Sequence, residues 1–167
     1  NKPQYDAVKD LEPISPIAIT AFALALHPSV PASNLKELIA HANANPGKLS
    51  YGSAGTGSLN HLTGEMFKLR TGLTYLIHVP YRGTGPAMND LLGAQVDFMC
   101  DQTTNTTSQI KGGKIKVFGV TTKTRVPSLK DVPTLDEQGL KGFEVAVWHG
   151  IYAPKATPKE AVDKLVA

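Results

Sequence analysis

Short apolar runs alternate with amphipathic helical patterns along most of this chain. Each apolar run is only a few residues long and is bounded by turn-forming residues, which is typical of a buried β-strand. Leu11–Ile17 carries two prolines and is expected to be an extended edge segment. Strands are expected at residues 19–26, 49–52, 75–79, 96–100, 115–120 and 145–152. This alternation indicates an α/β sandwich with a largely parallel sheet.

Capping and stop signals mark the helices between these strands. Asn34 with Glu37 three residues later forms a capping box, and the Asn-Pro-Gly sequence at 45–47 ends that helix. A second helix is expected to begin near Ser58. Its buried face is predicted to consist of Leu59, Leu62, Met66 and Leu69. Gly85 is expected to cap a third helix, with the following proline in its first turn. Shorter helices are expected at residues 103–111, 134–138 and 157–165.

Composition and charge argue against several classes of protein. The formal net charge is +3 and the basic residues are scattered singly, so nucleic acid is not an expected partner. No apolar stretch reaches the roughly 18 residues that a membrane span needs. The single cysteine, Cys100, lies in an apolar run and is expected to be a buried, unpaired side chain. The five histidines lack the spacing of metal ligands, so neither a metal nor a cofactor is expected.

Three strand-to-helix loops, at residues 51–58, 81–85 and 101–104, are the candidate ligand-binding segments. In open α/β sheets, ligands bind beyond the carboxyl ends of the strands, so these loops should converge on one edge. The first loop combines three glycines with the hydroxyls of Ser53, Thr56 and Ser58, and it leads into a helix. The free N–H groups and the dipole at a helix N-terminus favour an anion. Such an arrangement suits a small, multiply hydrogen-bonded carboxylate.

Side chains near these loops have alternative interpretations. His61 and His78 flank the proposed pocket and could donate hydrogen bonds to a ligand. Each glycine-rich loop could instead be a tight turn, Arg82 a solvated or structural arginine, and Asp101 a helix cap. The presence of three such loops in series favours the binding site over these separate explanations.

Enzyme motifs are broken at single positions. Tyr51 stands where the nucleophile elbow G-x-S-x-G requires glycine. Asn60 stands at the last glycine position of G-x-G-x-x-G. No catalytic residue is therefore expected. A hydrolase that uses Ser53, His61 and Asp101 is the enzyme alternative.

Four ordered segments resemble one receptor family. Lys48–Ser58, KLSYGSAGTGS, resembles the K-L-x-Y-x-S-x-G-x-G-[ST] loop of the tripartite tricarboxylate transporter receptors, the Bug (TctC-type) family. The segments His78–Gly83, Asp90–Asp97 and Asp131–Thr134 are also similar to family segments. Because the resemblance runs from about Asp10 to the end of the chain, the sequence is identified as a member of this family.

The resemblance implies a type II periplasmic-binding-protein fold, in which two α/β lobes close on a carboxylate. It also implies which residues of this chain contact the ligand. Those from the second lobe are Ser53, Ala54, Gly55, Thr56, Gly57, Ser58, His61, Tyr81, Arg82, Thr84 and Asp101, with Trp148 lining the hinge side. Arg82 occupies a position where lysine is common in the family, and Gln102 one where asparagine is frequent. The identity of the carboxylate therefore stays open.

The function implied by the resemblance is that of a periplasmic solute receptor. Such a receptor binds a small mono-, di- or tricarboxylate and delivers it to the membrane permease subunits of a tripartite tricarboxylate transporter. The alternative within the same fold is a carboxylate sensor for a membrane kinase.

The resemblance also implies that much of a receptor is missing from this chain. Family members are about twice as long, and their first lobe carries a glycine-rich P-F-x-x-G-G loop that this sequence lacks. Residues 1–20 are expected to be a first-lobe remnant and crossover, 21–142 the second α/β lobe, and 143–167 the return crossover strand and a first-lobe helix. The chain starts at Asn1 without a signal peptide, so it is expected to be a mature or trimmed piece. Unpaired strand edges would favour self-association.

Overall fold

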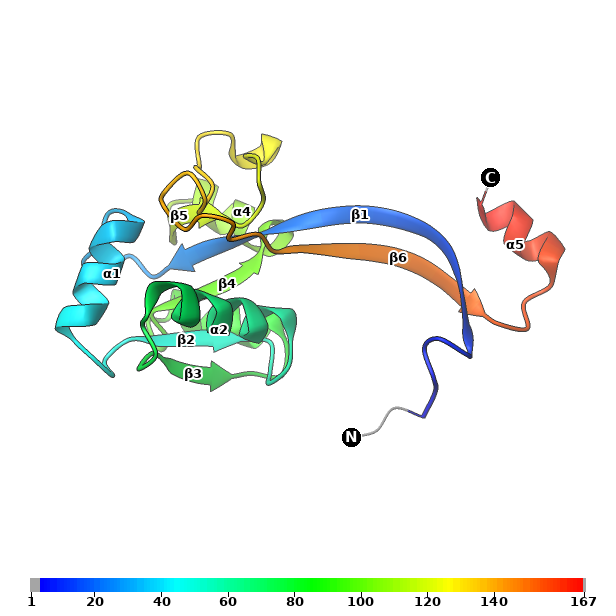
Figure 1. Cartoon of the computed structure of the whole chain (residues 1–167), viewed down its shortest axis with the longest axis horizontal. Helices are drawn as coiled ribbons and strands as arrows, with labels where there is room; N and C mark the ends of the chain where they lie inside the picture. The colour runs from blue at the N-terminus through cyan, green and yellow to red at the C-terminus, as the bar shows by residue number, and fades with distance from the viewer. Residues whose placement is uncertain (1–3, 167) are drawn as a thin grey trace. The chain divides into compact units, whose positions relative to one another are not determined.

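A computed structural model describes residues 4–166 of the chain (Figure 1). The elements are β1 (Leu11–Leu26), α1 (Leu35–Ala44), β2 (Ser50–Ser53), α2 (Leu59–Thr71), β3 (Ile77–Pro80), α3 (Thr84–Leu92), β4 (Phe98–Gln102), α4 (Thr103–Lys111), β5 (Lys116–Val120), the 3-10 turn η1 (Pro127–Leu129), β6 (Ala146–Pro154) and α5 (Lys159–Val166). Residues 1–3 and 167, which the expected end segments include, lie outside the described residues.

The chain divides into two compact units. The larger unit is Thr20–Ala146, and the smaller unit joins the described residues up to Ile19 with those from Val147 onward. Strands β1 and β6 each pass from one unit into the other.

The sheet of the larger unit has the strand order β3-β2-β4-β1-β5. Strand β2 runs parallel to β3 and β4, whereas β1 runs antiparallel to β4 and β5. The predicted largely parallel sheet is therefore confirmed for β3, β2, β4 and β5, and β1 is the exception inside it. Ala21–Leu26 of β1 is at most 2% exposed, in keeping with a strand covered on both faces.

Strand β1 is longer than expected, because it includes both the predicted edge segment and the predicted buried strand. The residues of β1 that pair with β4 and β5 all lie between Phe22 and Leu26. Pro13 and Pro16 lie in the earlier part of the strand, outside those pairings. Proline is tolerated there because an edge strand needs hydrogen bonds on only one side.

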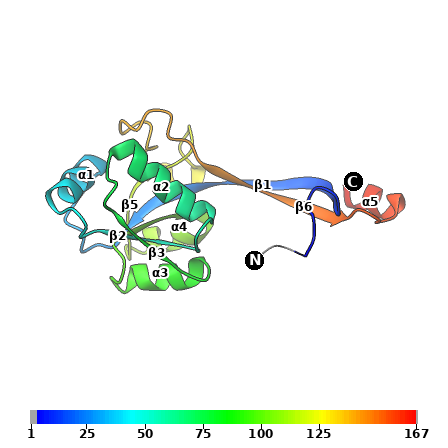
Figure 2. The same ribbon diagram turned by 60° about the horizontal axis from the view of Figure 1, so that its bottom comes forward.

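Helices cover both faces of the sheet in the larger unit. Tyr51 and Gly52 are consecutive in β2 and so point to opposite faces. Helix α2 lies on the Tyr51 face, where Phe67 packs edge-to-face on Phe98 at a centroid distance of 5.9 Å. Helix α3 lies on the Gly52 face, where Ala87 approaches that glycine. Figure 2 shows α2 and α3 on opposite sides of β2 and β3.

The Gly52 face carries an apolar cluster that fixes α3 and β4. Its buried members are Ala25, Ala87, Met88, Leu91, Val96, Met99 and Ile115. Full burial of a Val, Leu, Ile or Met side chain, as in this cluster, contributes roughly 1.5–3 kcal/mol to stability. Cys100 is also fully buried, as predicted, and burial raises the pKa of its thiol to about 12.

The predicted capping box of α1 is confirmed. The backbone N–H of Glu37 donates to Oδ1 of Asn34 at 2.9 Å. The carboxylate of Glu37 accepts the backbone N–H of Ser33 at 2.8 Å, one residue earlier than a standard box would have it. Leu35, Leu38 and Ala42 form the buried face of the helix.

The predicted buried face of α2 is wrong. Leu62 and Leu69 are 54% and 75% exposed. The buried residues are Asn60, Thr63, Gly64 and Phe67. The helix is rotated because Gly64 allows it to lie close against the ring of Tyr51, and because Asn60 finds buried hydrogen-bond partners in Cys100 and Asp101 of β4.

Two other helix predictions need correction. Helix α3 begins at Thr84 with Gly83 as its cap, so Gly85 lies within the first turn. Gly83 has φ of 113°, a conformation that favours glycine. Residues 134–138 form a turn, although Thr134 and Glu137 exchange capping hydrogen bonds of 2.7 and 3.0 Å. The N–H of Gly139 donates to the carbonyl of Asp136 at 3.1 Å, which closes a tight turn, and Gly139 has φ of 104°. The chain therefore leaves the helical path after one turn.

The smaller unit contains a strand pair and a terminal helix. Strand β6 pairs with the first part of β1, and the two lie side by side in Figures 1 and 2. The N–H of Lys155 donates to the carbonyl of Asp10 at 2.8 Å. Apolar side chains remain uncovered on this pair, including Ile17 at 63% exposed and Trp148 at 62%. None of the described side chains of α5 is buried.

Candidate functional site

Three helix N-termini meet at one edge of the sheet in the larger unit. Strands β3, β2 and β4 are adjacent and parallel, and they are followed in the chain by α3, α2 and α4. The first two loops touch directly. The N–H of Tyr81 donates to the carbonyl of Ser53 at 3.0 Å, and the N–H of Gly83 donates to that of Ala54 at 3.1 Å. The structure thus brings together the loops that the sequence singled out.

The first loop, residues 53–58, is shaped from within by Ser53. This residue has no exposed surface, and its Oγ accepts the N–H of Gly55 at 3.1 Å. The same Oγ lies 2.7 Å from Nε2 of His78. The backbone of Gly55 has φ of 127°, and a Cβ there would lie 3.0 Å from the carbonyl oxygen of Tyr81. The hydroxyl of Ser53 is therefore used inside the protein, and Gly55 lets the two loops approach.

His61 closes the far end of the same loop. Ser58 caps α2 by accepting the N–H of His61 at 3.3 Å. In return, Nδ1 of His61 accepts the N–H of Gly57 at 3.1 Å. Thr56 and Gly57 are exposed between these two fixed points. The loop therefore presents its tip to solvent while both ends are held.

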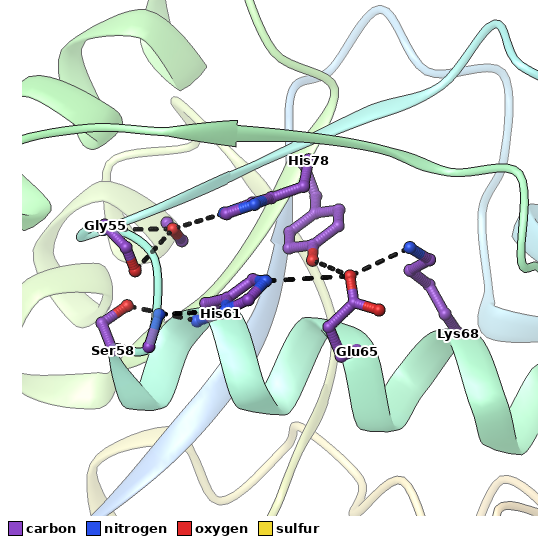
Figure 3. A network of polar contacts seen from close by, with 9 residues as sticks. Gly55, Ser58, His61, Glu65, Lys68 and His78 are labelled. Atoms are coloured by element: carbon purple, nitrogen blue, oxygen red, sulfur yellow. Dashed lines mark hydrogen bonds and ion pairs between the residues drawn. The ribbon is translucent and has the colours of Figure 1, made fainter.

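A stack of rings lies beside the loop (Figure 3). His78 lies between Tyr51 and His61, with ring centroids 4.9 and 4.1 Å away. The hydroxyl of Tyr51 donates to Glu65 at 2.5 Å, and Nζ of Lys68 donates to the same oxygen at 2.9 Å. The stack and the carboxylate form one connected group that joins α2 to β2 and β3.

Burial and charge set the protonation of this group. Burial, and then the neighbouring His61, lower the pKa of His78. Burial and the hydrogen bond to Glu65 raise the pKa of Tyr51. Burial opposes the charge on Glu65, but the hydrogen bonds from Tyr51 and Lys68 outweigh it, so the pKa of Glu65 is lowered. At neutral pH the group therefore contains a neutral His78 beside an ionised Glu65.

Asp101 anchors the third loop at the end of β4. Its side chain is fully buried and accepts Nδ2 of Asn60 at 2.9 Å and Nδ2 of Asn105 at 3.2 Å. Burial raises the pKa of Asp101, and these amide hydrogen bonds oppose that rise. Asn60 also donates to the carbonyl of Cys100 at 2.9 Å. Asp101 therefore fixes α2 and α4 to the sheet edge.

The second loop offers one cation and one uncapped helix. The side chain of Tyr81 turns toward α3, where its hydroxyl donates to Asp90 at 2.7 Å. Burial and that hydrogen bond raise the pKa of Tyr81 to about 12. Arg82 is exposed, and Thr84 is partly exposed as the first residue of α3. The cap residue of α3 is Gly83, which has no side chain to offer, and Pro86 in the first turn has no N–H. The backbone N–H groups that this N-terminus can present to an anion are therefore those of Thr84 and Gly85.

Trp148 belongs to the smaller unit, where its ring lies 6.3 Å from that of Tyr152. Its predicted place on the hinge side of a binding site stays a prediction.

The prediction of site residues missed the groups that hold the loops in place. Asn60 and Asn105 donate to Asp101, Glu65 lies 4.0 Å from Nε2 of His61, and Tyr51 stacks on His78, yet none of these four residues was predicted. A signal was present for Asn60, because a polar residue two positions after a helix cap interrupts an otherwise apolar pattern. No local signal points to Glu65, whose partner Tyr51 is 14 residues away.

The geometry rules out the hydrolase alternative. The histidine beside Ser53 is His78 rather than His61, and Asp101 accepts amide groups rather than an imidazole. Ser53 also has no exposed surface through which it could reach a substrate. This edge of the sheet can therefore bind a ligand, through helix N-termini, backbone N–H groups and the exposed Arg82.

The comparison with protein families decides the relationship. The model of the tripartite tricarboxylate transporter family receptor matches residues 1–167. The chain belongs to this receptor family. The family consists of solute-binding receptors, not enzymes, which agrees with the expectation that the chain has no catalytic residue. No helix among residues 4–166 is long and apolar enough to cross a membrane.

Relatives of this family show both the similarity and the missing length. A UPF0065 protein from the TAR-I ttuE-ttuC' intergenic region of Agrobacterium vitis is 40% identical over 161 residues, which cover 96% of this chain and 46% of that protein. The periplasmic binding protein BugD is 51% identical with a TM-score of 0.87, over 93% of this chain and 52% of BugD. The chain thus spans about half the length of the relatives that it matches.

Two further solved structures contain ligands. An R. palustris protein with adipate is 35% identical with a TM-score of 0.92, over 96% of this chain and 54% of that one. MatC from Rhodopseudomonas palustris, with bound malate, is 33% identical with a TM-score of 0.88, over 99% and 56%. These neighbours confirm the expected periplasmic-binding-protein fold.

Proposed function

We propose that this chain forms one side of the ligand site of a periplasmic receptor that binds a small carboxylate and delivers it to the permease subunits of a tripartite tricarboxylate transporter. The observation that carries the proposal is the meeting of three helix N-termini, those of α2, α3 and α4, at one sheet edge. Each N-terminus attracts an anion through its N–H groups and dipole, by about 0.3–1 kcal/mol at an exposed position.

The proposed ligand contacts divide into two kinds. Thr56, Gly57, Ser58, Arg82 and Thr84 are exposed or partly exposed at the edge and would face the carboxylate. The other predicted residues of this unit would act from behind by holding the loops, as the buried Ser53 and Asp101 do here. The malate and adipate bound by two structural relatives support a dicarboxylate as the first ligand to test.

The length of the relatives supports a two-lobed receptor. The chain spans about half of the A. vitis relative and of BugD, so the other side of the site would come from polypeptide outside this sequence. We assign 21–142 to the second lobe and the flanking segments 1–20 and 143–167 to crossovers and a part of the first lobe. The uncovered apolar side chains of the smaller unit, such as Ile17 and Trp148, are consistent with a surface built to be covered.

The test is a titration of the isotope-labelled chain with malate and adipate, followed through its backbone amide NMR signals. This measurement detects millimolar binding, which corresponds to about 4 kcal/mol. We expect shifts confined to residues 53–58, 81–85 and 101–104. Glucose and free arginine serve as ligand controls, and shifts with glucose but with neither dicarboxylate would contradict the proposal.

A matched pair of arginine variants tests the role of charge. Arg82→Gln should weaken malate binding about tenfold, the effect of one lost charge-assisted hydrogen bond. Arg125→Gln is the control, because Arg125 is exposed, belongs to none of the three loops and pairs with Glu137. Equal effects of the two variants would show that net charge rather than a defined contact attracts the ligand.

A further inference from the structure

We infer that His78 and His61 position the ligand loop by accepting its hydrogen bonds, and that protonation of this stacked pair releases the loop and weakens carboxylate binding. This inference rests on the proposed function of residues 53–58 as a ligand loop. In this inference the two histidines are positioning residues, which hold the loop and do not contact the ligand.

The first support is the direction of the hydrogen bond between Ser53 and His78. Oγ of Ser53 lies 2.7 Å from Nε2 of His78 and 3.3 Å from the carbonyl oxygen of Gly55. We assign the hydroxyl proton to this shorter contact, with Nε2 as its acceptor, and a lone pair of Oγ then accepts the N–H of Gly55 at 3.1 Å. This arrangement needs an unprotonated Nε2.

The second support is that His61 has the same requirement. Its Nδ1 accepts the N–H of Gly57 at 3.1 Å, so this nitrogen must also lack a proton. The amides of Gly55 and Gly57 are thus both held by imidazole nitrogens that act as acceptors, one through Ser53 and one directly. A protonated imidazole is a donor at both nitrogens. Protonation of His61 therefore removes the acceptor of Gly57, and protonation of His78 forces the hydroxyl of Ser53 to turn its proton away from the ring.

The surroundings of the pair decide how it responds to acid. His78 faces Tyr51, Ser53 and His61, and the nearby charges are those of Glu65 and Lys68 on α2. The two rings lie 4.1 Å apart, so the first proton disfavours the second. Nε2 of His61 lies 4.0 Å from Glu65, whose oxygen is shared with Tyr51 and Lys68 (Figure 3). Glu65 therefore stabilises a proton on the pair only in part.

The pH window follows from the position of His78. Burial and His61 lower the pKa of His78 below the ordinary value of about 6.5. The neutral ring, and with it the held loop, therefore predominates above about pH 6.5, and the loop is released as the pH falls through the lowered pKa. Slightly acidic conditions would thus favour release of the carboxylate.

The first experiment needs no ligand. Imidazole nitrogen and backbone amide NMR signals of the chain are followed together from about pH 8 to about pH 5, the range in which histidine titrates. We expect the amides of Gly55 and Gly57 to shift with the same midpoints as the rings of His78 and His61, and neutral His78 to carry its proton on Nδ1. Loop amides that stay fixed while the rings titrate would overturn the inference.

The second experiment compares variants in malate binding. His78→Phe keeps a stacked ring but loses the acceptor, so we expect about tenfold weaker binding at pH 7.5, the effect of one lost hydrogen bond. His78→Gln keeps an acceptor that does not titrate and should bind like the parent chain. His41→Gln is the control, since His41 lies in α1 and contacts Asn45, the residue that caps the end of that helix.

The parent chain and each variant are compared at the same pH, so that the protonation of malate affects both affinities equally. The double variant His61→Gln/His78→Gln should lose the part of the pH dependence of malate binding that comes from the chain. A double variant with the parent's pH profile, or a His78→Phe variant with the parent's affinity, would overturn the inference. Failure of the parent chain to bind any carboxylate would overturn the proposed function instead, while the ligand-free titration would still decide how the histidines hold the loop.

Discussion

Gly64 of α2 lies directly against the ring of Tyr51 in β2. A Cβ atom at position 64 would overlap three atoms of that ring. Tyr51 is itself fully buried, and its hydroxyl donates to Glu65, the next residue of the same helix. The glycine thus sets how closely α2 approaches the sheet, and so where the helix presents its N-terminus and His61.

We predict that Gly64→Ala destabilises the chain, although alanine favours a helix by about 1 kcal/mol over glycine. Overpacking a buried position costs about 1–3 kcal/mol, and the ring of Tyr51 has no open space into which to move. Urea unfolding followed by circular dichroism measures the change.

The matched control for this prediction is Gly85→Ala in the first turn of α3. A Cβ there meets no atom within 4 Å and its φ is not positive, so the variant should be as stable as the parent or slightly more so. A stabilised Gly64→Ala variant would contradict the close approach described here.

The sequence predicted the order of strands and helices well because those signals are local. The capping pair of Asn34 and Glu37, the cap at Ser58 and the apolar runs of the strands are each contained in a few residues. The buried face of α2 was not predictable in this way. Leucines at 62 and 69 suggested one face, but packing on Tyr51 and the reach of Asn60 to β4 selected another, and both partners are distant in sequence.

The corrected face of α2 gives a direct test. Phe67→Ala should cost about 3–5 kcal/mol, because the ring is fully buried and contacts Phe98 and Phe143. Leu62→Ala should change stability by less than about 0.5 kcal/mol, since the side chain is mostly exposed. Chemical denaturation measures the stability of the two variants. A larger loss of stability for Leu62→Ala would support the buried face that was predicted from the sequence.

The candidate site was also predictable only in part. Glycine-rich segments between strand and helix revealed the loops at 51–58 and 81–85, and the polar residues that follow an apolar run revealed the loop at 101–104. The sequence did not show which loop residues face the ligand and which hold the loop in place. Ser53 was predicted to contact the ligand, but its partner His78 comes from the neighbouring strand β3. The pairing of β2 with β3 brings that ring to the hydroxyl of Ser53.

The buried position of Ser53 and the exposed position of Thr56 predict different outcomes for two hydroxyl variants. Ser53→Ala removes a buried oxygen that serves Gly55 and His78, so it should cost about 1–3 kcal/mol of stability. Thr56→Ala should leave stability nearly unchanged, because the side chain is exposed at the tip of the loop. Thermal unfolding of the ligand-free variants makes the comparison. If Ser53→Ala melted like the parent chain, the hydroxyl would have to be assigned to the ligand after all.

The last prediction concerns two aspartates whose environments act in opposite directions. Burial raises the pKa of Asp101 above the ordinary value, whereas the N–H of Gly142 and the ammonium of Lys141 lower the pKa of the partly exposed Asp136. A raised carboxyl pKa means that folding favours the protonated form. The contribution of Asp101 to stability is therefore greatest below about pH 3.9 and is lost as the pH rises through its folded-state pKa. Asp136 contributes with the reverse sign, above its unfolded-state pKa.

Carboxyl carbon NMR signals followed against pH measure both midpoints in one sample, and Asp101 should titrate at the higher pH. Asn60→Ala sharpens the test, because Nδ2 of Asn60 donates to the charged form of Asp101 and lowers its pKa. The variant should move the midpoint of Asp101 further upward and leave that of Asp136 in place. It should also cost about 1–3 kcal/mol, since Asp101 and the carbonyl of Cys100 both lose a buried donor. A midpoint of Asp101 below that of Asp136 would show that the amide hydrogen bonds, not burial, dominate at this edge of the sheet.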